Sequence, residues 1–136
     1  MNKLEGLEEV FKKTRIIFMT TFQNGKENTR AMTNYNESPY EMIWFPTERG
    51  TQKVKDIEKD PKVILTFPAT EPGFFYEIEG KAEFEKQEIV DRKWEWWWLS
   101  WRPHQKDRFF FRRDRSDPNR VIINIYPKSV KITKKT

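Results

Sequence analysis

An Asn-Gly pair, Asn24-Gly25, separates two segments that both have the composition of β-strands. Residues 16–22 (IIFMTTF) are almost all β-branched or aromatic, and residues 27–35 (ENTRAMTNY) return after the turn. Asn-Gly is strongly preferred in two-residue hairpin turns, because both central residues of such a turn need a positive φ. We therefore expect an antiparallel hairpin near the start of the chain and an antiparallel sheet built onto it.

Five further segments are predicted to be strands, each bounded by turn signals. They are residues 40–45, 62–67, 74–85, 121–126 and 129–133. Pro46 is expected to end the first of them, and Pro127 to separate the last two. The 74–85 segment alternates well, and Gly80 within it indicates a bulge or a close approach of another backbone. Its predicted inward-facing residues are Phe74, Tyr76, Ile78, Ala82 and Phe84.

Helical spacing predicts a few short helices between these strands. They are expected at residues 4–14, from the candidate N-cap Thr51 to about Asp60, and at residues 87–101, and a further short helix or turn is expected at 102–113. The chain is one domain, residues 1–136, because no Gly-, Pro- or Ser-rich linker divides it. Its fold class is mainly β (α+β), with six or seven antiparallel strands, enough to close a small barrel, and a few short peripheral helices.

Composition excludes several kinds of chemistry. The chain has no Cys and one His, His104, so we expect no disulfide, no thiol nucleophile and no metal site. Aliphatic residues are few beside 11 Phe, 6 Trp and 4 Tyr, so aromatic side chains are expected to carry the core. A small domain of this kind is expected to bury further surface in a homodimer. No apolar stretch is long enough for a signal peptide or a membrane span, so a cytoplasmic location is expected.

Four polar residues could form an anion site. Arg30 and Lys53 supply positive charge, and a helix that starts after Thr51 supplies backbone N–H groups and the positive end of its dipole, with Thr47 nearby. This combination suits a phosphate group. Spacing alone leaves a second interpretation open, in which Thr51 is only an N-cap and Lys53 only a solvated helix residue.

A tryptophan-rich face and a basic segment lie side by side in the sequence. Trp94, Trp97, Trp98 and Trp101 share one face of the 87–101 helix, and residues 102–120 carry a local excess of basic side chains. The Trp face is typical of a core or a dimer interface, and it could equally receive a flat anionic ligand. His104 is expected at the surface or at an interface, with substrate contact as the alternative.

The order of these motifs resembles the general stress protein branch of the pyridoxamine 5'-phosphate oxidase-like FMN-binding split-barrel family. The matching elements are Thr21, Gly25, Arg30 with Met32, Trp44-Phe45-Pro46-Thr47, Thr51 with Lys53, Asp60-Pro61, Gly80 with Ala82, and Asp117-Pro118. The resemblance implies a split β-barrel and a homodimer that holds FMN between its subunits. It also implies which residues bind the cofactor: Arg30, Ala31, Met32, Thr33, Phe45, Pro46, Thr47, Thr51, Gln52 and Lys53. Trp97, Trp98, Trp101 and His104 would then form a lid supplied by the partner subunit, or would meet the substrate.

The chain departs from the family in two ways. Thr51 stands where the family usually has Ser, and the chain lacks the C-terminal substrate segment of true pyridoxamine-phosphate oxidases, so we do not expect it to oxidise pyridoxamine phosphate. The leading hypothesis is a flavin-dependent oxidoreductase that acts on a small flat or anionic substrate. The alternatives are a non-catalytic, stress-associated flavin-binding protein and a deazaflavin-dependent reductase. A single-stranded nucleic-acid binder, suggested by the basic, Phe-rich segment, is the most distant hypothesis.

Overall fold

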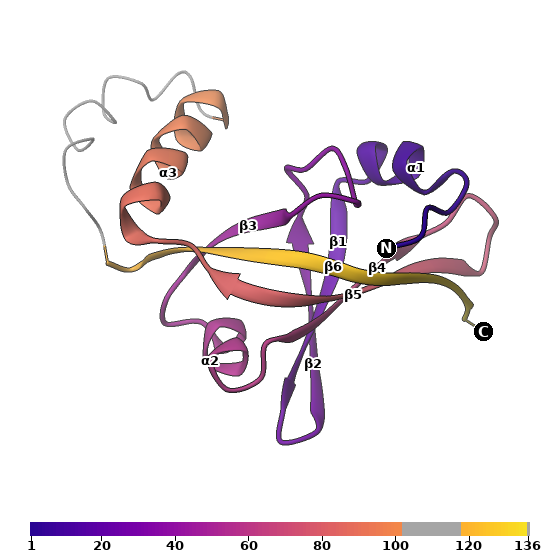
Figure 1. Ribbon diagram of the computed structural model, residues 1–136, viewed down its shortest axis with the longest axis horizontal. Helices are drawn as coiled ribbons and strands as arrows, with labels where there is room; N and C mark the ends of the chain where they lie inside the picture. Colours follow the sequence, from indigo (N-terminus) through magenta and orange to yellow (C-terminus); the bar gives the residue numbers. More distant parts are fainter. Residues whose placement is uncertain (102–117, 136) are drawn as a thin grey trace.

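A single curled antiparallel sheet forms the body of the computed structural model, which describes residues 1–101 and 118–135, without the side chains of residues 95–101. The strands follow the order β2-β1-β4-β5-β6-β3 in a half-barrel (Figure 1). Their bounds are β1 Ile16–Gln23, β2 Lys26–Thr33, β3 Ile43–Glu48, β4 Lys62–Pro68, β5 Phe74–Phe84 and β6 Arg120–Lys134. The helices are α1 Leu7–Lys13, α2 Gln52–Lys59 and α3 Gln87–Trp101. The predicted mainly β fold of six antiparallel strands with short helices is confirmed.

The predicted hairpin is β1 and β2. Asn24 and Gly25 have φ values of 51° and 82°, as a turn with two positive φ angles requires. Gln23 pairs with Lys26 on either side of this turn, and the register continues to Ile16 opposite Thr33. The turn therefore fixes which β2 residues share a face with which β1 residues, because directly opposed side chains point the same way.

The prediction that residues 40–45 form a strand ended by Pro46 was wrong at both ends. The strand begins at Ile43, and Pro46 lies inside it, opposite Ile122 of β6. Because β3 is an edge strand, a proline there can lack a donor without leaving a neighbouring carbonyl unpaired. Tyr40 belongs to the preceding loop, where its hydroxyl hydrogen-bonds the backbone of Leu4.

The two predicted C-terminal strands are one continuous strand, β6, so the predicted break at Pro127 was wrong. The pairing shifts register there: Ser129 opposes Glu79 and Pro127 opposes Gly80. Lys128 is thus the extra residue of a bulge, next to the proline. A Cβ on Gly80 would lie 2.8 Å from the Tyr126 carbonyl oxygen, so the predicted bulge and close backbone approach are confirmed.

The core is more aliphatic than expected. Phe11, Phe45 and Phe67 are fully buried, and the Phe11 and Phe67 rings meet edge to face with centroids 5.6 Å apart. Most other buried side chains are Ile, Val and Leu from the strands, so the expected aromatic core was wrong for the described residues. Phe84 was predicted to face inward, and it is 37% exposed because it ends β5.

Helix α3 has the predicted bounds and packs on β6. Residues 121–125 of β6 are all buried, which needs cover on both faces of the strand. The core covers Ile123, and the contact with α3, whose Val90 is 2% exposed, covers the opposite face at Ile122. Helix α1 begins three residues later than expected and buries Leu7 and Phe11. No described helix has the length and hydrophobicity needed to cross a membrane.

Candidate functional site

A pocket of about 400 Å³ lies where the two edge strands of the half-barrel come together. β2 and β3 stand at opposite ends of the strand order, yet residues of both line this pocket. The start of α2 and one side chain of α3 complete the wall. The lining residues are Ala31, Met32, Thr33, Tyr35, Phe45, Pro46, Thr47, Glu48, Thr51, Lys53 and Trp94.

The pocket joins most of the predicted cofactor-binding residues. Predicted residues that line it are Ala31, Met32, Thr33, Phe45, Pro46, Thr47, Thr51 and Lys53. The other two, Arg30 and Gln52, do not line it and instead contact Asp56 beside it. The structure therefore separates the predicted set into a pocket wall and a polar cluster behind that wall.

The first turn of α2 forms one end of the pocket. Thr51 occupies the N-cap position, as predicted, but its hydroxyl makes no capping bond. The hydroxyl donates instead to the Glu48 carbonyl oxygen at 2.8 Å. The first backbone N–H groups of a helix have no partner within it, so this turn can offer donors to an anion.

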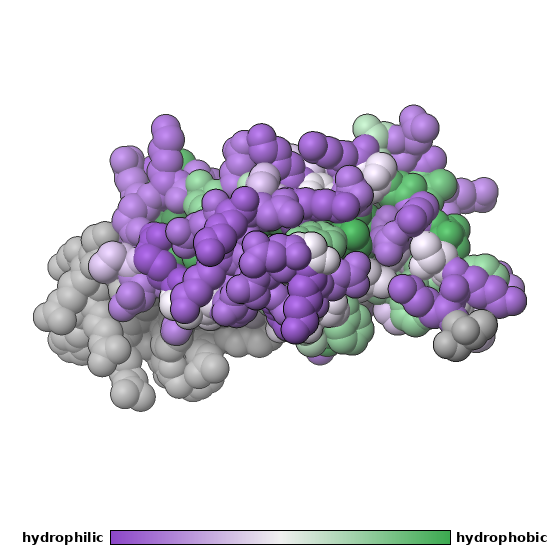
Figure 2. Space-filling model, turned by 90° about the horizontal axis from the view of Figure 1, so that it is seen from below, coloured by the Kyte–Doolittle hydropathy of each residue, from purple (hydrophilic) through white to green (hydrophobic). Residues whose placement is uncertain are grey.

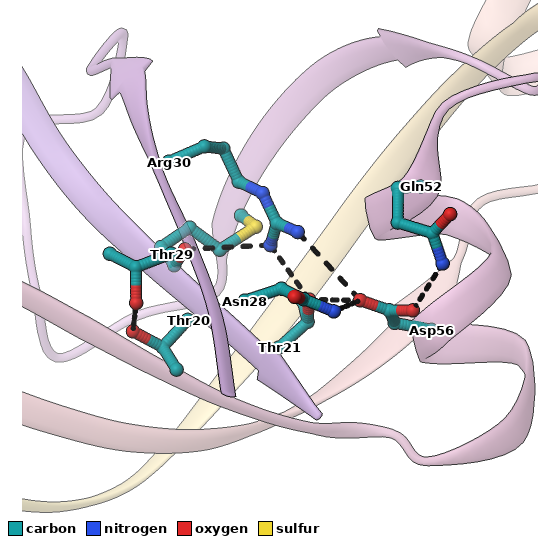
Figure 3. Close-up of polar contacts among 8 residues, drawn as sticks. Thr20, Thr21, Asn28, Thr29, Arg30, Gln52 and Asp56 are labelled. Carbon is teal, nitrogen blue, oxygen red and sulfur yellow. Dashed lines mark hydrogen bonds and ion pairs between the residues drawn. The ribbon is translucent and has the colours of Figure 1, made fainter. Parts of the chain in front are cut away.

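Arg30 is held by neighbours on β1 and α2 (Figure 3). Its Nη1 donates to the Thr21 hydroxyl at 2.7 Å and to the Met19 carbonyl oxygen at 3.4 Å. Its Nη2 lies 3.7 Å from the Asp56 carboxylate, and the Arg30 side chain is 23% exposed. Burial lowers the pKa of Arg30, although the charge of Asp56 and its hydrogen bond oppose that shift.

Asp56 is a buried carboxylate at the centre of this cluster, 1% exposed. Its Oδ2 accepts hydrogen bonds from the Thr21 hydroxyl at 2.7 Å and the Asn28 amide at 3.0 Å, and its Oδ1 accepts one from Gln52 at 2.8 Å (Figure 3). Burial alone would raise the pKa of Asp56. The three hydrogen bonds and the charge of Arg30 outweigh burial and hold the pKa below its ordinary value.

Lys53 and Arg30 are close enough to influence one another. Burial lowers the pKa of Lys53, the positive charge of Arg30 lowers it further, and the carboxylate of Glu48 acts in the opposite direction. Two cations from different elements, β2 and α2, are thus brought together beside the pocket. The sequence predicted this juxtaposition.

Aromatic side chains also line the site. Phe45, Tyr35 and Trp94 line the pocket, and the Tyr35 ring stacks on Trp44 with centroids 6.1 Å apart and planes 25° apart. The Trp94 ring has the Arg120 guanidinium 5.8 Å from its centroid. The side chains of Trp97, Trp98 and Trp101, and the whole of His104, lie outside the described residues, so the lid stays a prediction.

Sequence reasoning missed Asp56, Tyr35 and Glu48. For Asp56 a signal was present, because it lies next to Ile57 and two residues after Val54, on the side of α2 that turns inward. An acid on the buried side of a short helix needs a partner, and Arg30 was the candidate cation already in view. Tyr35 and Glu48 carried no comparable signal, since Tyr35 lies at the end of a predicted strand and Glu48 lies between a predicted strand and a predicted helix.

The fold and this site define a class: half-barrel proteins with a pocket between the two edge strands that is lined by a lysine and by aromatic side chains. The sequence profile described as "Pyridoxamine 5'-phosphate oxidase like" matches residues 2–132. The chain therefore belongs to the pyridoxamine 5'-phosphate oxidase-like family.

Individual relatives agree with this assignment. General stress protein 26 of Bacillus subtilis (strain 168) is 30% identical over 118 residues, which cover 84% of this chain and 76% of the relative. The crystal structure of general stress protein 26 from Bacillus anthracis str. Sterne superposes with a TM-score of 0.63 at 24% identity, covering 94% of this chain and 98% of that one. A structure described as an F420 reductase gives a TM-score of 0.66 at 18% identity, covering 95% and 98%.

Proposed function

We propose that this protein binds FMN in the pocket between β2 and β3 and acts as a flavin-dependent oxidoreductase on a small flat or anionic substrate. One observation carries the proposal: a single pocket is lined both by Thr51 and Lys53 at the start of α2 and by walls formed by Ala31, Met32 and Phe45. A flavin nucleotide has the same two parts, a phosphate and a flat ring system.

The residues present fit such a ligand. Lys53, Arg30 behind it and the unpartnered N–H groups at the start of α2 match the charge and acceptor oxygens of a phosphate. β2 is an edge strand, so the outward backbone groups around Met32 have no strand partner in the sheet and can meet the polar rim of the ring. Phe45 and Pro46 offer apolar surface to its flat part.

Bound FMN would supply hydride and electron transfer, and the protein would supply binding, orientation and electrostatics. Lys53 and the α2 turn would hold the phosphate. Pro46 and Phe45 would offer apolar contact to the ring system. Glu48, which lines the pocket, places one negative charge near Lys53 and limits the positive charge of that end.

A homodimer is part of the proposal. Phe18 of β1 is directly opposite Ala31, and Ile16 is opposite Thr33, so these four side chains share one face of the hairpin. Ile16 is 46% and Phe18 41% exposed, and Ala31 and Thr33 line the pocket. The pocket thus adjoins an apolar surface that a second copy would cover. Figure 2 shows that such surface is not general, because hydrophilic side chains predominate on the face it displays.

The first test is an absorption spectrum of the purified protein with and without added FMN, together with FMN titration by quenching of flavin fluorescence. The Arg30→Ala/Lys53→Ala variant is expected to bind FMN at least about a hundred-fold more weakly, because it removes both cations that would attract the phosphate. The matched control is Lys55→Ala/Lys59→Ala, which removes two exposed cations from the same helix and should bind normally. A wild-type protein that neither binds FMN nor quenches its fluorescence would contradict the proposal.

Two alternatives have specific tests. The fold likeness to the F420 reductase favours a deazaflavin in the same pocket, which competition between FMN and the deazaflavin would reveal. A non-catalytic flavin-binding protein would keep its flavin colour when candidate substrates are added without oxygen. The basic segment behind the nucleic-acid hypothesis lies largely at residues 102–117, outside the described residues.

A further inference from the structure

Asp56 does not line the pocket between β2 and β3, yet it is linked to both elements that would hold the phosphate, α2 and β2. It belongs to α2, the helix that carries Lys53 and begins after Thr51. Through its contact with Arg30 it also reaches β2, which forms the opposite wall. The buried carboxylate is therefore the direct link between the two cationic parts of the site.

Arg30 has donors left over after these contacts. A guanidinium has five N–H donors. Those on Nη1 go to Thr21 and Met19, and Nη2 faces Asp56. Among the residues that the structure describes, none accepts a hydrogen bond from Nε. Nε is therefore the donor of this guanidinium that remains for a phosphate oxygen.

The Asp56 carboxylate is itself rigidly placed. It accepts from the Thr21 hydroxyl, the Asn28 amide and the Gln52 amide, and it is 1% exposed. Thr21 acts twice, because its hydroxyl accepts from Arg30 and donates to Asp56. A long Arg side chain on an edge strand otherwise samples many rotamers, and this arrangement removes that freedom before a ligand arrives.

We infer that Asp56 is a positioning residue of the phosphate site, which acts through Arg30 by holding its guanidinium at Nη2 so that Nε is left to donate to the phosphate of the ligand. This inference rests on the proposed function. It assigns to Asp56 a role in ligand binding beyond its contribution to the stability of the sheet and helix. If Asp56 has this role, replacing it should weaken ligand binding only when Arg30 is present and only when the ligand carries a phosphate.

The test measures dissociation constants for FMN and for riboflavin, which lacks the phosphate. The variants are Asp56→Asn, Arg30→Ala and the combination, with Glu58→Gln as a control that removes one exposed acid from the same helix. An Asn side chain keeps only one acceptor oxygen for the three donors that face it, so Arg30 loses its orientation. We expect Asp56→Asn to weaken FMN binding about ten-fold or more, the effect of one misplaced charge-assisted hydrogen bond.

The same substitution should change riboflavin binding less than about two-fold, and it should change FMN binding less than about two-fold when Arg30 is already Ala. An equal loss for both ligands, or in both backgrounds, would overturn the inference and leave Asp56 a purely structural residue. Tighter FMN binding by Asp56→Asn would also overturn it, since the carboxylate would then act only as a competing charge. A wild-type protein that binds neither ligand would instead remove the proposed function itself.

Circular dichroism would check that each variant is folded at the titration temperature. If Asp56→Asn does not fold, Thr21→Val provides the second route, because it removes the hydroxyl that joins Arg30 to Asp56 and leaves the charges in place. The same pattern is expected, with a loss for FMN and none for riboflavin. A Thr21→Val protein that binds FMN as tightly as the wild type would overturn the inference.

Discussion

Asp56 should make the stability of this protein depend on acidity. Its pKa is lower in the folded protein than the ordinary value of 3.8, because three hydrogen bonds and the charge of Arg30 outweigh the opposing effect of burial. A depressed pKa means that the folded state prefers the ionised carboxylate. Its contribution is therefore complete at neutral pH and is lost as the pH falls below the unfolded value toward the folded one.

We expect Asp56→Asn to lower the free energy of unfolding by about 3 kcal/mol at pH 7, as when one partner of a buried ion pair is removed. The difference between variant and wild type should shrink as the pH is lowered below about 4, where the unfolded carboxyl is protonated. Urea unfolding followed by tryptophan fluorescence at several pH values measures both quantities. A difference that stays constant down to the lowest pH would show that the charge of Asp56 is not involved.

At the level of the strands, the bulge between β5 and β6 depends on Gly80. A Cβ at this position would lie 2.8 Å from both the Tyr126 carbonyl oxygen and the Ile125 Cγ2 atom. The carbonyl is part of the neighbouring strand and cannot move without disturbing the register shift that accommodates Pro127. Gly80→Ala should therefore destabilise the protein by about 1–3 kcal/mol, as overpacking does elsewhere.

The control for that prediction is Gly50→Ala. Nothing lies within 4 Å of a Cβ built on Gly50, and its φ is not in the left-handed region. Its free energy of unfolding should stay within about 0.5 kcal/mol of the wild type. Denaturant unfolding of both variants gives the comparison, and equal effects at the two glycines would contradict the role of the close approach.

Local signals in the sequence predicted some elements well and others badly. The β1–β2 hairpin follows from positive φ angles that Asn and Gly accept, and the irregularity at Gly80 follows from a close approach that leaves no room for a side chain, so both could be located. The limits of β3 and the continuity of β6 could not be predicted. A proline ends a strand only where the neighbouring strand needs the backbone N–H that proline lacks. Whether Pro46 and Pro127 lie at an edge or a bulge depends on partners far away in the sequence.

The same limit applies to the site. Arg30 and Lys53 could be proposed together from the order of family motifs, but the orientation of Arg30 depends on Asp56 and Thr21. Those contacts are made between side chains on three elements, β1, β2 and α2. Composition also gave a wrong prediction of an aromatic core. Many aromatic residues fall in α3 and in the sequence after it, whereas the aliphatic residues concentrate in the strands.

For the whole molecule, the central prediction concerns assembly. Phe18→Arg places a charge on the apolar face that adjoins the pocket and should convert a dimer into a monomer. Light scattering coupled to size-exclusion chromatography measures the mass. FMN affinity should fall at the same time, since the pocket would lose the cover of the second subunit.

Ile132→Arg is the control for assembly, because Ile132 is 49% exposed but lies on β6, away from the hairpin face. It is expected to leave both the mass and the FMN affinity unchanged. A monomeric wild-type protein, or equal effects of the two substitutions, would contradict the predicted interface.

The strand order also has a consequence for how the protein is made. β3 is synthesised early, yet its strand partner among the described residues is β6, where Phe45 lies opposite Ile123 late in the chain. While the ribosome is still adding α3, the nascent chain can pair β1 with β2 and with β4, and β4 with β5, but the strand that pairs with β3 has not yet been made. Its wall of the pocket therefore forms last, so during biosynthesis the cofactor can be taken up only once β6 has left the exit tunnel.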